Sequence, residues 1–187
     1  VDTPAATSQS VVTGHTIGLS VLGSDSAGEN TLTYTWAVAS GPVGAFVDFS
    51  ANGSNAAKIS SATFHQAGQY TFQVTISDGS AAVFSSVGVM VDQSLTSLTV
   101  TPAAQSSALR GQVSLNAAGY DQFGAMMATA PTVTWSTTLG SVSDSVFNSG
   151  TTPGSALITA HSGDLSASTT IAVVDAPPVL TAPASAN

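Results

Sequence analysis

Residues 70–79 read Tyr70-Thr71-Phe72-Gln73-Val74-Thr75-Ile76-Ser77-Asp78-Gly79, and they carry the clearest strand pattern of the sequence. Apolar side chains alternate with polar ones from Tyr70 to Ile76, which is the pattern of a strand with one buried face. Asp-Gly is among the strongest short signals for a turn between two strands. A further apolar run, Val83 to Val91, follows this turn. We therefore predict a β-hairpin that packs one face against a core.

The same alternation recurs along the chain, with one tryptophan in each half. Trp36 lies in the run 31–38, and Trp135 lies in the run 131–136. Their separation is roughly 100 residues, the size of one immunoglobulin-like (Ig-like) sandwich. No stretch carries the apolar stripe of a helix over three turns. The sequence predicts an all-β chain of two tandem Ig-like antiparallel β-sandwiches in a linear arrangement.

The boundary between the two sandwiches is expected at Val91-Asp92-Gln93-Ser94, which is short and polar. We predict a first domain over residues 1–92 and a second over 93–175. Residues 176–187 are then a linker or the start of a next repeat, because they hold three prolines that cannot serve a central strand. Aligning Pro183 with Pro4 superimposes a Pro-Ala pair at an offset of 179 residues (183 − 4).

Composition narrows the function. Charged residues make up 6% of the chain, against about 25% in ordinary soluble proteins. Only Lys58 and Arg110 are basic and the net charge is −8, so nucleic acid and anionic membranes are not expected partners. The chain has no cysteine and no apolar run of membrane-spanning length. We expect a secreted or cell-surface protein, with any signal peptide outside these residues.

Catalytic residues are not evident. His15, His65 and His161 lie near predicted turns in different strands, and no serine, histidine and aspartate set forms a nucleophile motif. We therefore expect no enzymatic activity. Asn52-Gly53-Ser54 formally matches a glycosylation sequon, but we interpret it as a hairpin turn.

Calcium is the one cofactor that the sequence suggests. In an Ig-like sandwich, the loop after the second strand and the loop before the last strand lie at the same end of the domain as the start of the first strand. In the first domain this brings together four acidic residues: Asp2, Asp25, Glu29 and Asp78. Carboxylate oxygens from several segments are what Ca²⁺ requires, so these residues form a candidate calcium site. The alternative is that Asp and Asn are present because turns favour them. The second domain offers a weaker calcium candidate with three acidic residues: Asp92, Asp121 and Asp164.

Exposed aromatic rings would be needed for sugar binding. Most aromatic residues fall on the core-facing phase of their strands: Tyr34, Trp36, Tyr70, Phe72 and Trp135. Phe46 and Phe49 are out of phase with each other, so one of the two is expected to be exposed. This gives a carbohydrate platform little support, because core packing is the commoner fate of phenylalanine.

Three runs in the first half resemble a polycystic-kidney-disease-type (PKD-like) domain: Leu32 to Trp36, Ala67 to Gly79 and Val83 to Val91. The resemblance covers residues 4–92. Trp36 is followed by Ala37-Val38-Ala39 and not by the usual acidic motif of this family, so the domain is better described as PKD-like or cadherin-like.

Residues 95–174 are similar to bacterial Ig-like domains of the invasin and intimin type. The carrying motifs are Leu98 to Pro102, Asp121 to Gly124, Val133 to Ser136, Gly154 to Ala160 and Ser166 to Val174. The resemblance implies a spacer within a large secreted or surface-anchored protein. Fold alone does not license an activity.

Together these observations predict a structural segment of an adhesin, stalk or fibre that acts as a semi-rigid rod. Its partners would be neighbouring Ig-like domains of the same chain or other copies. One alternative is a self-assembling subunit of an extracellular filament, because a surface of Ser, Thr and Ala carries little repulsion between copies. A second alternative is a module that binds glycans or proteins through its loops.

Overall fold

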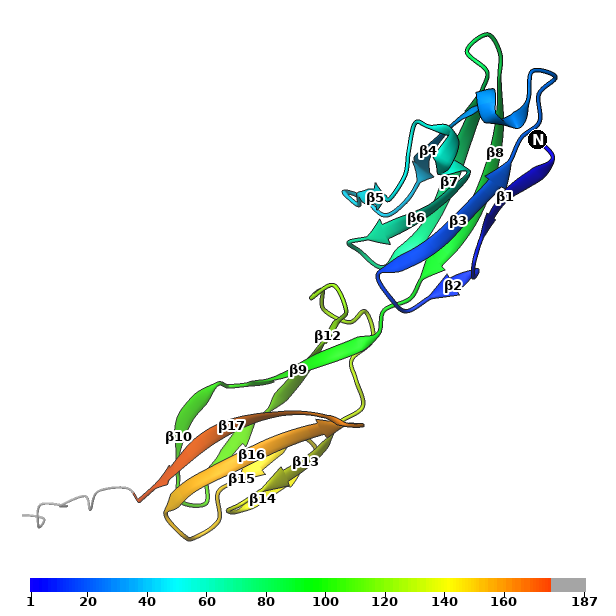
Figure 1. Ribbon diagram of the computed structural model, residues 1–187. Coiled ribbons are helices and arrows are strands. Elements are labelled where there is room, and N and C mark those ends of the chain that lie inside the picture. The colour runs from blue at the N-terminus through cyan, green and yellow to red at the C-terminus, as the bar shows by residue number, and fades with distance from the viewer. Residues whose placement is uncertain (176–187) are drawn as a thin grey trace, which may run out of the picture. The chain divides into compact units, whose positions relative to one another are not determined.

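The computed structural model describes residues 1–175, in which seventeen strands and two short 3₁₀ helices form the secondary structure (Figure 1). The predicted linker or next repeat, residues 176–187, lies outside the described residues. The chain divides into two compact units. Unit 1 comprises Val1–Leu95 and Tyr120–Ala125, and unit 2 comprises Thr96–Gly119 and the chain from Met126 onward.

Unit 1 is a sandwich of two four-stranded sheets. One sheet has the order β1 (Thr3–Thr7), β3 (Thr16–Leu22), β6 (Ile59–Phe64) and β5 (Val47–Phe49). The other has the order β2 (Val11–Val12), β8 (Ala82–Val91), β7 (Gly68–Ser77) and β4 (Thr33–Ser40). The helices η1 (Glu29–Thr31) and η2 (Asn55–Lys58) lie in its connections.

The predicted hairpin is confirmed in strands β7 and β8. They pair antiparallel, with Ile76 opposite Val83 and Phe72 opposite Val87. Gly79 has φ 91° in the turn between them, a conformation that glycine adopts at little cost. The Asp-Gly turn therefore sets which residues of β7 and β8 pair, and this register decides which face of the two strands points to the core.

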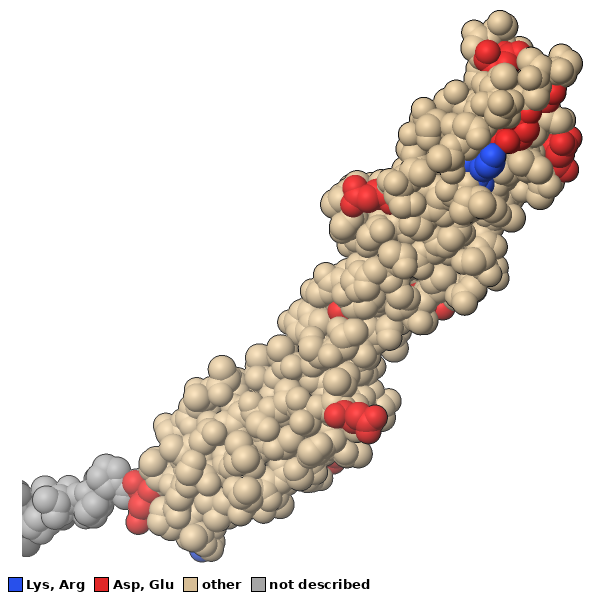
Figure 2. All heavy atoms as spheres, in the orientation of Figure 1, with Lys and Arg blue, Asp and Glu red and all other residues tan. Residues whose placement is uncertain are grey.

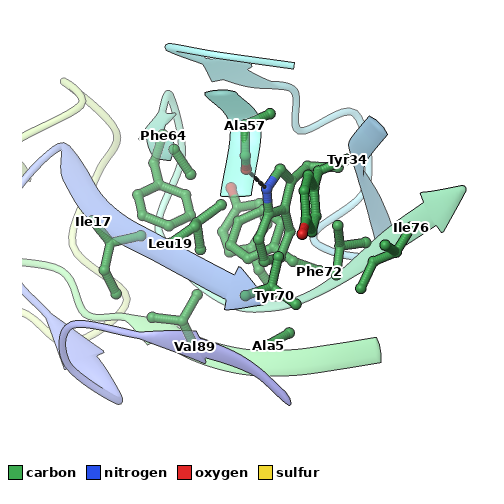
Figure 3. Close-up of a cluster of buried hydrophobic side chains, with 14 of the residues drawn as sticks. Ala5, Ile17, Leu19, Tyr34, Ala57, Phe64, Tyr70, Phe72, Ile76 and Val89 are labelled. Carbon is green, nitrogen blue, oxygen red and sulfur yellow. Dashed lines mark hydrogen bonds between the residues drawn. The ribbon is translucent and has the colours of Figure 1, made fainter. Parts of the chain in front are cut away.

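Aromatic side chains fill the core of unit 1, as the alternation predicts. Trp36 is 2% exposed, and Tyr34, Tyr70 and Phe72 are fully buried. The Trp36 indole Nε1 donates to the Ala57 carbonyl at 2.8 Å, drawn as the dashed line in Figure 3. The ring of Phe64 lies 4.9 Å from that of Tyr70, measured between centroids. Both sheets of the sandwich thus contribute rings to one core.

Unit 2 is built on the same plan with shorter strands. Its largest sheet has the order β10 (Ala104–Ala108), β17 (Leu165–Val174), β16 (Gly154–Ser162) and β13 (Thr134–Thr137). The remaining strands are β11 (Gln112–Ser114), β15 (Val146–Asn148) and β14 (Ser141–Ser143) in one sheet, and β12 (Asn116–Asp121) and β9 (Leu95–Thr101) in another. Phe147, Ile158 and Ile171 are fully buried. Trp135 packs against this core from a partly buried position.

The all-β Ig-like prediction is confirmed, with two departures from purely antiparallel pairing. Strand β2 pairs parallel to β8, and β10 pairs parallel to β17. In each unit the chain's first strand is split. In unit 1, β1 pairs with β3 of one sheet and β2 with β8 of the other. A chain that changes sheets in this way supplies one edge strand to each of the two sheets.

Candidate functional site

Two of the four predicted calcium residues line a small pocket in unit 1. Its volume is about 90 Å³, and Asp25 and Asp78 both line it. Asp25 follows β3, and Asp78 follows β7, so two loops converge here as predicted. The other lining residues are mostly apolar or small: Val1, Gly23, Ser24, Leu32, Ile76, Ala81, Ala82 and Val83. Figure 2 shows acidic side chains gathered over this part of unit 1.

Both pocket carboxylates also serve their own turns. Asp25 Oδ1 accepts the backbone N–H of Ala27 at 2.7 Å. Asp78 Oδ1 accepts the backbone N–H groups of Ser80 and Ala81, each at 2.7 Å. The hydrogen bonds from the Ala81 and Ser80 backbone hold the pKa of Asp78 below its ordinary value. The turn alternative therefore accounts for one oxygen of each carboxylate.

Asp2 lies beside the pocket. Its Oδ1 accepts the Ser24 hydroxyl at 2.7 Å, and its backbone N–H donates to the Leu22 carbonyl at 2.9 Å. Because Ser24 itself lines the pocket, the chain's first residues are tied to the same loop as Asp25.

Glu29 does not join the other three. Its Oε2 forms an ion pair with Lys58 Nζ at 2.7 Å, and its Oε1 accepts from the Tyr34 hydroxyl at 2.9 Å and from Asn55 Nδ2 at 3.0 Å. The hydrogen bond from Lys58 is the main reason why the pKa of Glu29 lies below its ordinary value. Burial raises the pKa of Tyr34. Glu29 thus fastens η1 to η2 and β4.

Calcium binding stays a prediction. Within residues 1–175, no group of three or more Asp, Glu, His or Cys side chains is placed to hold a metal ion. Calcium needs six to eight oxygen ligands, and the pocket itself offers two carboxylates.

The calcium prediction has a direct test. If Asp2, Asp25 and Asp78 bind the ion, calcium should raise the melting temperature of unit 1 above its value in chelator, because a ligand that binds only the folded state stabilises it. Asp78→Asn should remove that increase, whereas Glu29→Gln should keep it. Differential scanning calorimetry with calcium and with chelator measures both. Identical melting curves in the two conditions would contradict the calcium site.

The pH dependence of unit 1 follows from four groups. Burial raises the pKa of Tyr34 and Tyr70 above 10.0, so their contribution is complete below pH 10 and is lost as the pH rises through the folded values. Hydrogen bonds lower the pKa of Glu29 below 4.5 and that of Asp78 below 3.8, so their contribution is lost in acid. Unit 1 should therefore be most stable between about pH 5 and 10.

Thermal melting between pH 3 and 11 tests this dependence. Tyr70→Phe should reduce the alkaline loss of unit 1, because it removes one titrating hydroxyl. Unit 2 serves as the internal control, because Tyr120 at the end of β12 belongs to unit 1 and the residues of unit 2 include no tyrosine. Equal alkaline losses in the two units would contradict the assignment to Tyr34 and Tyr70.

The three histidines have separate partners. His65 Nε2 lies 2.8 Å from Asp48 Oδ2, and the His65 ring stacks on Phe46 at 4.1 Å between centroids. His161 Nε2 lies 3.2 Å from Ser136 Oγ, and the ring of His15 meets that of Phe123 edge-on at 4.8 Å. These contacts give each histidine a local structural role.

One further sequence prediction is confirmed and one is wrong. Phe46 is 59% exposed while Phe49 packs against the core, as the phase difference requires. The Asn52 side chain accepts the Trp36 backbone N–H at 2.7 Å and donates to the Trp36 carbonyl at 2.9 Å. The sequon does not form the predicted hairpin turn: it lies in the connection between β5 and β6, where Gly53 donates to the Tyr34 carbonyl and Ser54 forms a β-bridge with Tyr34, and the Asn52 amide is occupied.

Asp121 has a different environment from the one predicted. It is 2% exposed. Its Oδ1 accepts the backbone N–H groups of Phe123 and Ala125, each at 2.9 Å, and its Oδ2 accepts from Gln93 Nε2 at 2.9 Å. Asp121 therefore organises the loop Tyr120–Ala125, which belongs to unit 1. An aspartate in an Asp-Gln-Phe-Gly turn gives no sequence signal of such burial.

Comparisons with known proteins agree with this architecture. The two units define a protein of the Ig-like β-sandwich class. Residues 5–91 match the family described as K319L-like, PKD domain, and the chain has a PKD-like, cadherin-like and Ig-like fold. No curated protein matches the sequence.

The chain matches solved structures at low identity, and the fold is supported by the first of the three that follow. Drosophila N-cadherin EC1-4 is 12% identical, with a TM-score of 0.56 over 78% of this chain and 41% of that chain. This chain thus spans less than half of the N-cadherin structure. The D0-D1 domain of intimin is 16% identical, with a TM-score of 0.28 over 88% of this chain and 93% of that chain. Surface layer protein SbsC, domains 4-9, is 19% identical, with a TM-score of 0.37 over 91% and 27%.

Proposed function

We propose that this chain is a structural tandem Ig-like segment of a larger secreted or cell-surface protein, and that it acts as a semi-rigid rod. The proposed domains are residues 1–92 and 93–175. The observation that carries this function is that each unit has a core of its own. One cluster is built around Trp36 and the other around Phe147.

The use of charge in unit 1 supports a structural role. Lys58 is paired with Glu29, and the carboxylates of Asp25 and Asp78 accept backbone N–H groups of their own loops. Ionisable side chains in these positions stabilise connections between strands. Among residues 1–175, no helix is long and apolar enough to cross a membrane.

A self-assembling filament subunit is the second candidate. The four strands of the sheet β2-β8-β7-β4 contain no charged residue. Phe84 is 60% exposed, Val11 48% and Met90 37%. Such a sheet surface offers little electrostatic resistance to a neighbouring copy.

A binding module is the third candidate, supported by one exposed ring. Phe46 stacks on His65, which also contacts Asp48. A ring backed by a second ring and flanked by a carboxylate is a suitable surface for a sugar or a peptide side chain. Binding to a glycan array, with Phe46→Ala as the control, tests this candidate.

Electron microscopy of the purified chain at high concentration, with calcium and with chelator, separates the first two candidates. A rod-like spacer gives isolated two-lobed particles in both conditions. Ordered filaments would instead establish the self-assembling subunit. Collapsed particles without two resolved lobes would contradict both.

A further inference from the structure

Three side chains in unit 1 contact one another in a closed triangle. Lys58 Nζ lies 2.7 Å from Glu29 Oε2 and 3.1 Å from Asn55 Oδ1. Asn55 Nδ2 in turn donates to Glu29 Oε1 at 3.0 Å. An amine, a carboxamide and a carboxylate therefore meet at hydrogen-bond distance. These are the groups that an amide exchange requires, in which an amine displaces ammonia from a carboxamide.

The helix η2 holds the amine and the carboxamide together. Asn55 and Lys58 are its first and last residues, three positions apart, and side chains at this spacing lie one above the other in a 3₁₀ helix. The backbone between them is fixed, because Ala57 is fully buried and its carbonyl accepts the Trp36 indole N–H. The two reacting groups are thus positioned by the fold and do not have to find each other.

The Asn55 carboxamide presents its carbonyl oxygen to the lysine. Its nitrogen is held by three acceptors, which are Glu29 Oε1, the Glu29 carbonyl at 2.9 Å and the Leu32 carbonyl at 3.0 Å. The carbonyl carbon lies about 1.2 Å from the oxygen that Lys58 contacts, the length of a C=O bond. A nucleophile held beside its electrophile in this way reacts at a high effective concentration. The same three acceptors are suited to receive the nitrogen as it leaves.

The Glu29 carboxylate lies between the two nitrogens that exchange. Its Oε2 contacts the lysine amine and its Oε1 contacts the asparagine amide. A carboxylate in this position can take a proton from the attacking nitrogen and deliver one to the leaving nitrogen, which is general acid–base catalysis. The Tyr34 hydroxyl also donates to Oε1, at 2.9 Å, and helps to hold the carboxylate in place.

We propose that Lys58 and Asn55 condense to an intramolecular isopeptide bond, with Glu29 as the group that transfers the protons. The Lys58 ammonium first gives a proton to Glu29 Oε2, because only the neutral amine is a nucleophile. Nζ then bonds to Asn55 Cγ, and the Cγ–Nδ2 bond breaks with its electron pair on Nδ2. The nitrogen leaves as ammonium and carries the two protons that Nζ has lost. Glu29 is regenerated, and no oxidant or other reactant is consumed.

The reaction is expected to be slow. The hydrogen bond from Lys58 keeps the pKa of Glu29 below its ordinary value, so the ion pair is the resting state and the neutral amine forms rarely. The side chains of Lys58 and Glu29 are 32% and 29% exposed, which leaves the departing ammonium a path to solvent. Release of ammonium into bulk water then makes the bond permanent.

The bond changes how unit 1 meets proteases. Lys58 and Arg110 are the only basic residues of the sequence, and Lys58 is the only one that belongs to unit 1. An acylated lysine has no positive charge, so a protease that cuts after lysine or arginine loses its one site in this unit. The inference concerns unit 1 alone and does not depend on the proposed rod.

Mass spectrometry of the full 187-residue chain tests the bond. The purified protein is aged at 37 °C, denatured, measured as an intact mass and then digested with trypsin. The intact mass should fall below that of the sequence by one ammonia. Trypsin should then give two fragments, 1–110 and 111–187, because Lys58 is no longer cleaved. Without the bond, the first fragment is cut again after Lys58.

Two variants are the matched controls, and circular dichroism checks that both fold. Lys58→Arg keeps a cation beside Glu29, but its guanidinium stays protonated and does not attack, so the mass should remain that of its sequence. Glu29→Gln keeps a hydrogen-bonding side chain and removes the carboxylate. It should slow the loss of ammonia by about a hundredfold or more, the usual contribution of general acid–base catalysis.

Three results would overturn the proposal. The first is an aged chain that keeps its full mass and is cut completely after Lys58. The second is a loss of ammonia that persists in Lys58→Arg, because it would then come from another amide, such as Asn52 before Gly53. The third is a Glu29→Gln variant that condenses as fast as the unaltered chain. None of these results affects the proposed function, which microscopy tests separately.

Discussion

Replacement of Trp36 by alanine is expected to destabilise unit 1 strongly and leave the stability of unit 2 unchanged. Trp36 is 2% exposed and its indole donates to the Ala57 carbonyl. Truncation of a buried tryptophan costs about 3–5 kcal/mol, a large part of the 5–15 kcal/mol that typically stabilises a domain. The melting temperature of unit 1 should fall by roughly 20 °C. Trp135 then remains as the single tryptophan and reports on unit 2 by fluorescence.

A conservative variant separates packing from hydrogen bonding at this position. Trp36→Phe keeps most of the buried ring but loses the indole N–H, so it should cost less than the alanine variant. If Trp36→Ala also abolished the fluorescence transition of Trp135, the two units would not fold independently, and the rod of separate modules would lose its basis.

Phe147→Ala is expected to have the reciprocal effect on unit 2. Phe147 is the largest fully buried side chain of its core, and the backbone of Gly140 packs close to its ring. Its removal leaves a cavity that costs about 3–5 kcal/mol. The core of unit 2 has fewer buried residues than that of unit 1, so this loss should leave unit 2 largely unfolded at 37 °C while unit 1 keeps its transition in calorimetry.

Leu157→Ala provides the matched control in the same unit. Leu157 lies on β16 and is 46% exposed, so its truncation should change stability by no more than about 0.5 kcal/mol. A similar loss from Leu157→Ala and Phe147→Ala would show that the core around Phe147 does not hold unit 2 together.

Much of the fold could be predicted because it follows from the alternation of apolar and polar residues along single strands. Alternation identifies the hairpin of Tyr70 to Ile76 and places Trp36 in the core, since neighbouring residues in a strand point to opposite faces. The same rule separates Phe46 from Phe49. The parallel pairings of β2 with β8 and of β10 with β17 were not predictable, because they depend on where the first strand of each unit changes from one sheet to the other.

The candidate site was less predictable because it depends on long-range pairing. Converging loops could be inferred for Asp25 and Asp78 from strand order. The partner of Glu29 could not, because Lys58 lies 29 residues away in sequence and only the tertiary structure brings them together. The burial of Asp121 likewise depends on Gln93, a residue of a different segment.

The contact between Asn52 and Trp36 has a consequence for solubility. Strand β4 lies at the edge of its sheet, and an edge with free N–H and C=O groups is a template for aggregation. The Asn52 amide occupies both backbone groups of Trp36, and Ser54 bridges to Tyr34 beside it. The Asn52 side chain thus makes the two hydrogen bonds that a neighbouring strand would make with Trp36. Proteins usually protect such edges with charged side chains. This chain has few charged residues, and it protects the edge of β4 with hydrogen bonds from Asn52 and Ser54.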